Sequence, residues 1–157
     1  MTPDTPARLL QDRAVLWSIG ELPAPDLVQA ACDALVAGLD SPTLRRLAAL
    51  TRAEAGYDVR ELLPRALDEL GLVCPAPGST AGQEAAARVF CRRLLRGELS
   101  PRALAFWAHR THGHDLPLTA RLAELDDAYD MTEYGGPTAA ELDAEVTAEA
   151  RRLAARP

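Results

Sequence analysis

Apolar residues recur along this chain at intervals of three and four positions, which is the period of one face of an α-helix. The clearest example is the stretch 59–70, which Gly71 follows at a position typical of a helix end. Its apolar stripe consists of Val59, Leu62, Leu63, Ala66, Leu67 and Leu70. Pro64 lies inside the stripe and predicts a bend of this helix or a break near Leu63.

Capping residues mark where helices are expected to begin. A Ser, Thr or Asp N-cap precedes either Pro at the first helical position or Glu or Gln three residues later. Five such signals are Ser41-Pro42, Asp58 with Glu61, Thr80 with Gln83, Ser100-Pro101 and Thr138 with Glu141. Together with the periodicity they predict an all-α fold, a single-domain helical bundle of about seven to eight short helices.

The length and composition support one helical domain over residues 1–157. Aromatic residues make up only 4% of the chain, which favours helices over strands. A loop at 72–80, rich in Pro, Gly and Ser, separates two helical halves. Because each half is short for a stable core of its own, we expect this loop to lie within one domain.

Charge and missing residue types exclude several classes of function. The chain has no Lys, which removes Schiff-base chemistry and the phosphate-binding Lys of a P-loop. Its net charge of -6 argues against binding to nucleic acid or to an anionic membrane. Three widely spaced Cys residues without a CxxC pair, and no long apolar run, indicate reduced thiols in a cytoplasmic protein.

All three histidines fall within six positions, His109, His112 and His114, and Asp115 follows them. His109 and His112 are three positions apart on one helical face and could share a first-row metal ion, with His114 or Asp115 folding back from a turn at Gly113 as a third ligand. An imidazole near a helix C-terminus is also favoured electrostatically without any ligand. The spacing matches no established metalloenzyme motif, so the metal site is the alternative hypothesis.

The segment 121–150 is strongly acidic, with nine acidic residues against one Arg and a net charge of -8. Most charge runs on helices are simply solvated faces, here with Tyr129 turned to the core. Aromatic side chains among the carboxylates also suit recognition of a cationic protein surface. The predicted partner-binding residues are Asp126, Asp127, Asp130, Glu133 and Tyr134.

Two catalytic interpretations remain weaker. Asp126 or Asp130 could orient His112 for acid-base catalysis, but the sequence does not show that these side chains meet. Cys91 stands beside Phe90 on an apolar stripe, which predicts a buried and inert thiol rather than a nucleophile.

Two short segments, Leu39–Ala49 and Leu125–Asp130, resemble stretches of small helical bacterial proteins without an assigned function, some of which are regarded as immunity or accessory proteins. The expected function is therefore a noncatalytic, cytoplasmic protein-binding domain that requires no cofactor and engages a basic protein surface. Nucleic acid and membranes are not expected partners, and a homodimer through the Ala-rich helix faces remains open. The alternative is a metal-dependent enzyme with a divalent ion and a His/Asp site at 109–133.

Overall fold

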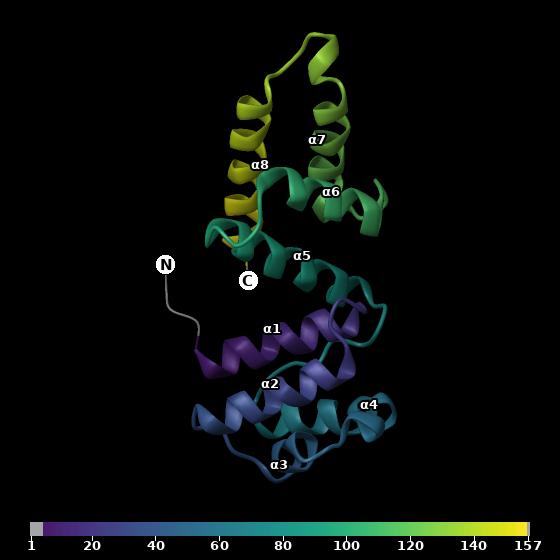
Figure 1. Cartoon of the computed structure of the whole chain (residues 1–157), viewed down its shortest axis with the longest axis vertical. Coiled ribbons are helices and arrows are strands. Elements are labelled where there is room, and N and C mark those ends of the chain that lie inside the picture. The colour runs from purple at the N-terminus through teal and green to yellow at the C-terminus, as the bar shows by residue number, and fades with distance from the viewer. Residues whose placement is uncertain (1–4, 157) are drawn as a thin grey trace. The chain divides into compact units, whose positions relative to one another are not determined.

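The computed structural model describes residues 5–156, and residues 1–4 and 157, the two ends of the predicted domain, lie outside them. Over the described range the chain forms helices and no β-strand, which confirms the predicted all-α fold (Figure 1). The α-helices of this range are α1 (Pro6–Ser18), α2 (Ala24–Val36), α3 (Pro42–Ala48), α4 (Arg52–Glu69), α5 (Thr80–Leu95), α6 (Pro101–His112), α7 (Ala120–Asp130) and α8 (Ala139–Ala154). Two single-turn 3-10 helices, η1 (Pro117–Thr119) and η2 (Thr132–Tyr134), flank α7.

The helices group into two compact units, an N-terminal unit up to Ala86 and a C-terminal unit from Ala87 onward. The division falls within α5, whereas the predicted separating loop at 72–80 belongs to the N-terminal unit. The organisation of residues 1–157 as one domain stays a prediction.

In the N-terminal unit, α2 packs against α1, α3 and α4, and α3 also packs against α4. The leucines that face inward from these helices are fully buried, which gives the unit its apolar core. They include Leu10, Leu27, Leu44, Leu47, Leu63 and Leu67. The Gln11 side-chain amide also binds both backbone groups of Val73, which holds the segment after α4 against α1.

Helix α4 begins seven residues earlier than the Asp58 signal predicts. Thr51 and Glu54 form a capping box, in which the Glu54 carboxylate accepts from the Thr51 N–H at 2.7 Å and the Thr51 hydroxyl accepts from the Glu54 N–H at 3.3 Å. The predicted start at Asp58 is therefore wrong, because the preceding turn already supplies a complete cap.

Pro64 predicts either a bend or a break near Leu63, and the break is wrong, because α4 continues through Pro64 to Glu69. The Pro64 ring lies on the exposed face of the helix, while Leu63 and Leu67 are fully buried. Burial of this apolar face outweighs the cost of a proline inside a helix, which is about 3 kcal/mol.

Three of the four remaining start signals are confirmed, and the fourth is displaced by one residue. The hydroxyls of Ser41, Ser100 and Thr138 cap α3, α6 and α8 as expected. At α5 the capping hydroxyl is that of Ser79, which accepts from the Gly82 N–H at 3.1 Å, so the predicted cap at Thr80 is one residue late.

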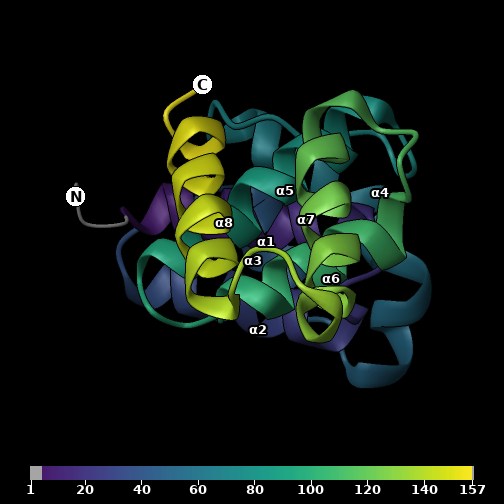
Figure 2. The same cartoon turned by 90° about the horizontal axis from the view of Figure 1, so that it is seen from above.

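In the C-terminal unit, α6, α7 and α8 pack against one another in all three pairs. Helices α7 and α8 run side by side in opposite directions (Figures 1 and 2). The rings of Phe90 and Trp107 stack with their centroids 3.9 Å apart. This three-helix arrangement carries both candidate site segments, because His109 lies on α6 and the acidic residues lie on α7 and η2.

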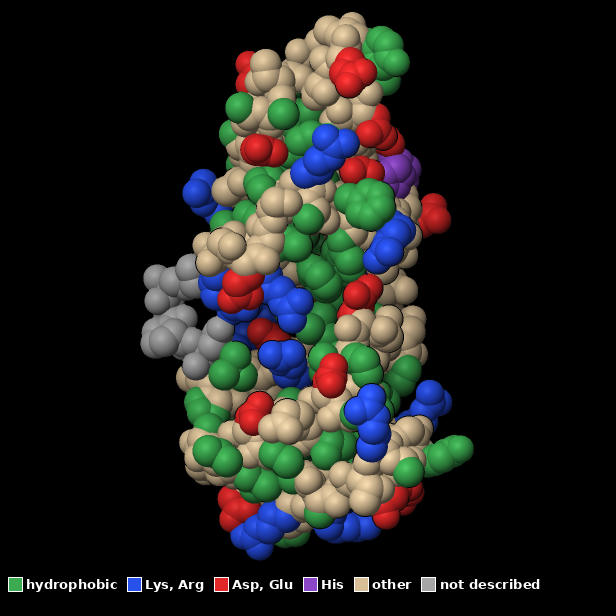
Figure 3. All heavy atoms as spheres, in the orientation of Figure 1, with side chains coloured by type: hydrophobic (Ala, Val, Ile, Leu, Met, Phe, Trp, Pro, Cys, Tyr) green, Lys and Arg blue, Asp and Glu red, His purple; other side chains and the backbone are tan. Residues whose placement is uncertain are grey.

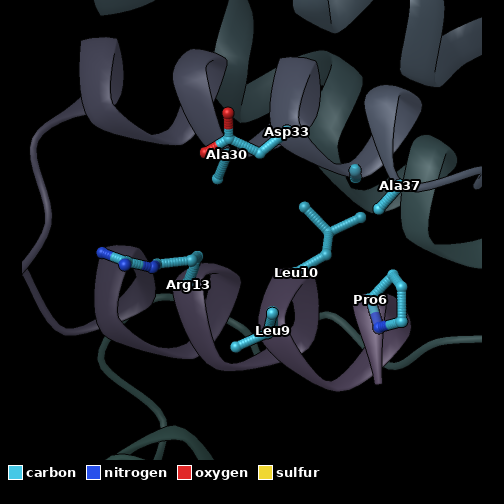
Figure 4. A pocket seen from close by; sticks show the side chains of 8 residues that line it. Pro6, Leu9, Leu10, Arg13, Ala30, Asp33 and Ala37 are labelled. Carbon is cyan, nitrogen blue, oxygen red and sulfur yellow. The ribbon is translucent and has the colours of Figure 1, made fainter. Parts of the chain in front are cut away.

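A small groove of about 110 Å³ lies between α1 and α2. Arg13 and Asp33 stand at one end of it, and Pro6 and Ala37 stand at the other (Figure 4). Its lining is mainly apolar, and none of the predicted site residues lies in it.

The start of α4 gives a first testable prediction. We expect Thr51→Ala to lower the free energy of unfolding by about 1 kcal/mol, because it removes the capping box. Asp58→Ala should change it by less than about 0.5 kcal/mol, because Asp58 lies inside the helix and caps nothing. Urea unfolding followed by circular dichroism measures both, and a larger loss in Asp58→Ala would contradict this helix start.

Candidate functional site

A glycine turn at the end of α6 controls where the histidines lie. The helix ends at His112, and Gly113 has φ +57°, a conformation that favours glycine over other residues. The Gly113 N–H donates to the carbonyl of His109 at 2.8 Å, which closes the last turn of the helix. The chain then reverses, so that the His114 ring lies beside the His109 ring with centroids 4.8 Å apart.

The packing of α7 on α6 brings two carboxylates to these imidazoles. His109 Nδ1 lies 2.9 Å from Asp126 Oδ2 and 3.6 Å from Asp127 Oδ1. His114 Nε2 lies 3.2 Å from Asp127 Oδ2. The Asp126 side chain is only 15% exposed, whereas the side chains of His114 and Asp127 are open to solvent.

The structure brings together two of the three predicted histidines, His109 and His114, with the carboxylate of Asp127 in place of that of Asp115. One ligand atom each from His109, His114 and Asp127 lies within 4.8 Å of the others. His112 packs edge-on against Trp107 instead, with ring centroids 5.3 Å apart. The prediction that His109 and His112 share an ion is therefore wrong for this geometry, because His114 takes the place of His112. The predicted contact of Asp126 with His112 is also wrong, because Asp126 contacts His109.

Helical spacing does not predict that the side chains of His109 and His114 lie next to each other. Five positions do not place two side chains on one face of a continuous helix. The available signal is Gly113, whose freedom at positive φ allows the chain to turn back on the helix that it ends.

The remaining predicted contact residues lie at the exposed end of α7 and on η2. Asp130 pairs with Arg102 at 3.7 Å, and both side chains are exposed. Tyr134 on η2 is 77% exposed, and Glu133 beside it is also exposed. Acidic and hydrophobic side chains lie interspersed on the visible surface of the C-terminal unit (Figure 3).

Tyr129 connects the end of α7 to α8. Its ring is buried, as expected from the sequence, and its hydroxyl donates to Asp143 Oδ1 on α8 at 2.5 Å. Burial, together with the hydrogen bond and the negative charge of Asp143, raises the pKa of the Tyr129 hydroxyl. The phenol therefore stays neutral and serves as a link between α7 and α8.

An open groove of about 520 Å³ runs beside the Asp126 carboxylate. Arg102, Phe106 and Asp130 line it together with Ser100, Ala103 and Asp126. The guanidinium of Arg102 lies 5.2 Å from the centroid of the Tyr129 ring, which holds this cation over the aromatic face. The groove thus offers an exposed aromatic ring, one guanidinium and two carboxylates.

Cys91 is fully buried, as the sequence predicts. Burial, as the largest cause, raises the pKa of its thiol to about 12, and the nearby charge of Glu149 acts in the same direction. A thiol with so high a pKa supplies almost no thiolate near neutral pH, so Cys91 is not a nucleophile.

No protein-family model, no curated protein and no solved structure matches this chain. The function therefore has to be argued from the site itself. Within the described range, none of the helices combines the length and the apolar character that crossing a bilayer requires.

The state of Cys91 can be tested by its reactivity. In a Cys32→Ser/Cys74→Ser variant, we expect no reaction with Ellman's reagent at about pH 8 in the folded protein. One thiol per chain should react after unfolding in guanidinium, because the buried thiol then becomes accessible. A rapid reaction of the folded variant, at a rate typical of an exposed thiol, would contradict the burial of Cys91.

Proposed function

We propose that this chain is a noncatalytic protein-binding domain whose acidic surface engages a partner protein with a basic surface. The acidic surface comprises Asp126, Asp127, Asp130, Glu133 and Tyr134. The observation that carries the proposal is the exposed Tyr134, which projects from η2 next to exposed carboxylates. Tyrosines of this kind are common anchors of protein interfaces, and the surrounding charge favours a cationic partner.

The contacts within the C-terminal unit divide the acidic surface into two parts. Asp126 and Asp127 face His109 and His114, so a partner gains less from them. The pair between Asp130 and Arg102 spans 3.7 Å between two exposed side chains, and such pairs contribute little because water and salt screen them. Partner contacts are therefore expected mainly at Asp130, Glu133 and Tyr134.

The charge around this surface supports recognition at longer range. The segment 121–150 has a net charge of -8, more negative than the whole chain at -6. A concentration of one sign of charge speeds the approach of an oppositely charged protein and lowers the affinity for acidic ones. Two copies of this chain would repel each other at this surface, so we favour a different protein over a homodimer contact there.

The finer predictions belong to the same proposal. An immunity or accessory role in the cytoplasm agrees with a small binding domain whose three cysteines are free thiols. The alternative, a metal-dependent enzyme at residues 109–133, finds less support. Catalytic groups generally need a site that excludes water, whereas His114 and Asp127 are exposed.

An affinity experiment with a matched control tests the proposal. Purified wild-type chain and the variant Asp130→Arg/Glu133→Arg/Tyr134→Ala serve as baits in extract of cells that encode this protein. We expect a basic protein to be retained by the wild type and to bind the variant at least about tenfold more weakly, a loss of about 1.4 kcal/mol. The affinity of the wild type should also fall with rising salt.

The control variant Glu61→Arg/Asp68→Arg/Tyr57→Ala makes the same change of charge and removes another exposed Tyr, because Tyr57 on α4 is 85% exposed. It should bind the partner like the wild type. Equal retention by all three baits, or loss of binding in the control alone, would place the interface away from the acidic surface. Melting temperatures without the partner show that both variants remain folded.

A further inference from the structure

His109 on α6, His114 in the turn that follows α6, and Asp127 on α7 converge in the C-terminal unit. One ligand atom from each lies within 4.8 Å of the others, and the two rings are 4.8 Å apart at an angle of 64°. We infer that these three side chains form a binding site for a divalent first-row transition metal ion, with Zn²⁺ as the ion best suited to it. This inference does not rest on the proposed docking function, because metal binding requires no partner protein.

The local backbone already brings the ligands together. His109 is held by the last turn of α6, and the Gly113 turn returns His114 to its side. Asp127 is carried on α7, which packs directly against α6. Binding an ion then requires small side-chain rotations rather than a rearrangement of helices, so little conformational entropy is lost on binding.

A fourth side chain supports the first imidazole. Asp126 Oδ2 lies 2.9 Å from His109 Nδ1, and its side chain is 15% exposed. A carboxylate that accepts from one ring nitrogen fixes the tautomer and leaves the other nitrogen for a metal, an arrangement found around most metal-binding histidines. Asp126 lies outside the converging group, so we assign it the role of positioning the His109 ring rather than that of a ligand.

The ligand types select the class of ion. Two imidazoles and one carboxylate suit Zn²⁺ and its neighbours in the first row, whereas Mg²⁺ and Ca²⁺ prefer sites made of oxygen atoms. Three protein ligands are one fewer than the four of a closed zinc site, which leaves a position for water or for a side chain of another molecule.

Zinc titration of purified, untagged protein tests the inference. The Cys32→Ser/Cys74→Ser background removes the two thiols that are only partly buried and could bind zinc elsewhere. Calorimetry should show one Zn²⁺ per chain. We expect His114→Ala and Asp127→Asn to weaken the binding at least about tenfold, and Asp126→Asn to weaken it about 10- to 100-fold.

Asp115→Asn is the matched control, because Asp115 is an exposed carboxylate next to His114 that lies outside the converging group. It should bind Zn²⁺ like the background protein. Equal affinities of the background protein and His114→Ala, or no binding at all, would overturn the inference. Circular dichroism without metal shows that each variant is folded.

The imidazole signals in NMR spectra provide a second measurement that requires no substitution. The chain has three histidines, and His112 packs against Trp107 and lies outside the converging group. On addition of Zn²⁺, the ring signals of His109 and His114 should shift together while those of His112 change little. A shift confined to His112, or equal shifts of all three rings, would overturn the assignment of ligands.

Discussion

The packing of α7 against α6 and α8 is the constraint on which both proposed sites depend. Toward α8, the ring of Tyr129 is buried and its hydroxyl donates to Asp143, which links the two helices. Toward α6, the packing of the two helices brings Asp126 within 2.9 Å of His109. Both the carboxylates that face the imidazoles and the exposed end of α7 are therefore positioned by this packing.

Much of the fold is readable from the sequence because helix starts are local. Ser41, Ser100 and Thr138 cap their helices as predicted, since a hydroxyl needs only the next three residues to act. The predicted helix start at Asp58 is wrong because this segment contains two possible N-caps, and the earlier one, Thr51, forms a complete capping box. The break at Pro64 does not occur because burial of the opposite helix face, a tertiary effect, outweighs a local preference.

The candidate site was predictable as a region but not as a set of contacts. Clustering of His and Asp types directed attention to residues 109–133, yet the partners of His109 come from α7, which is distant along the chain. Pairing of His114 with His109 further depends on one positive φ at Gly113, and helical spacing alone favours His112. Long-range packing and a single turn thus decide the chemistry that local patterns leave open.

The two proposals are coupled through charge because they share Asp127 and lie on one short helix. Asp126 and Asp127 stand three or four positions before Asp130, close enough for their charges to interact on a helix surface. A bound divalent cation would offset the charge of these two carboxylates and leave Asp130 and Glu133 as the main source of negative potential. A basic partner would then meet a less acidic surface and bind more weakly. A partner that supplies the fourth ligand of the ion would instead gain a metal–ligand bond, which offsets the weaker electrostatic attraction. If both proposals hold, metal occupancy and partner affinity are linked, and by equal factors in both directions.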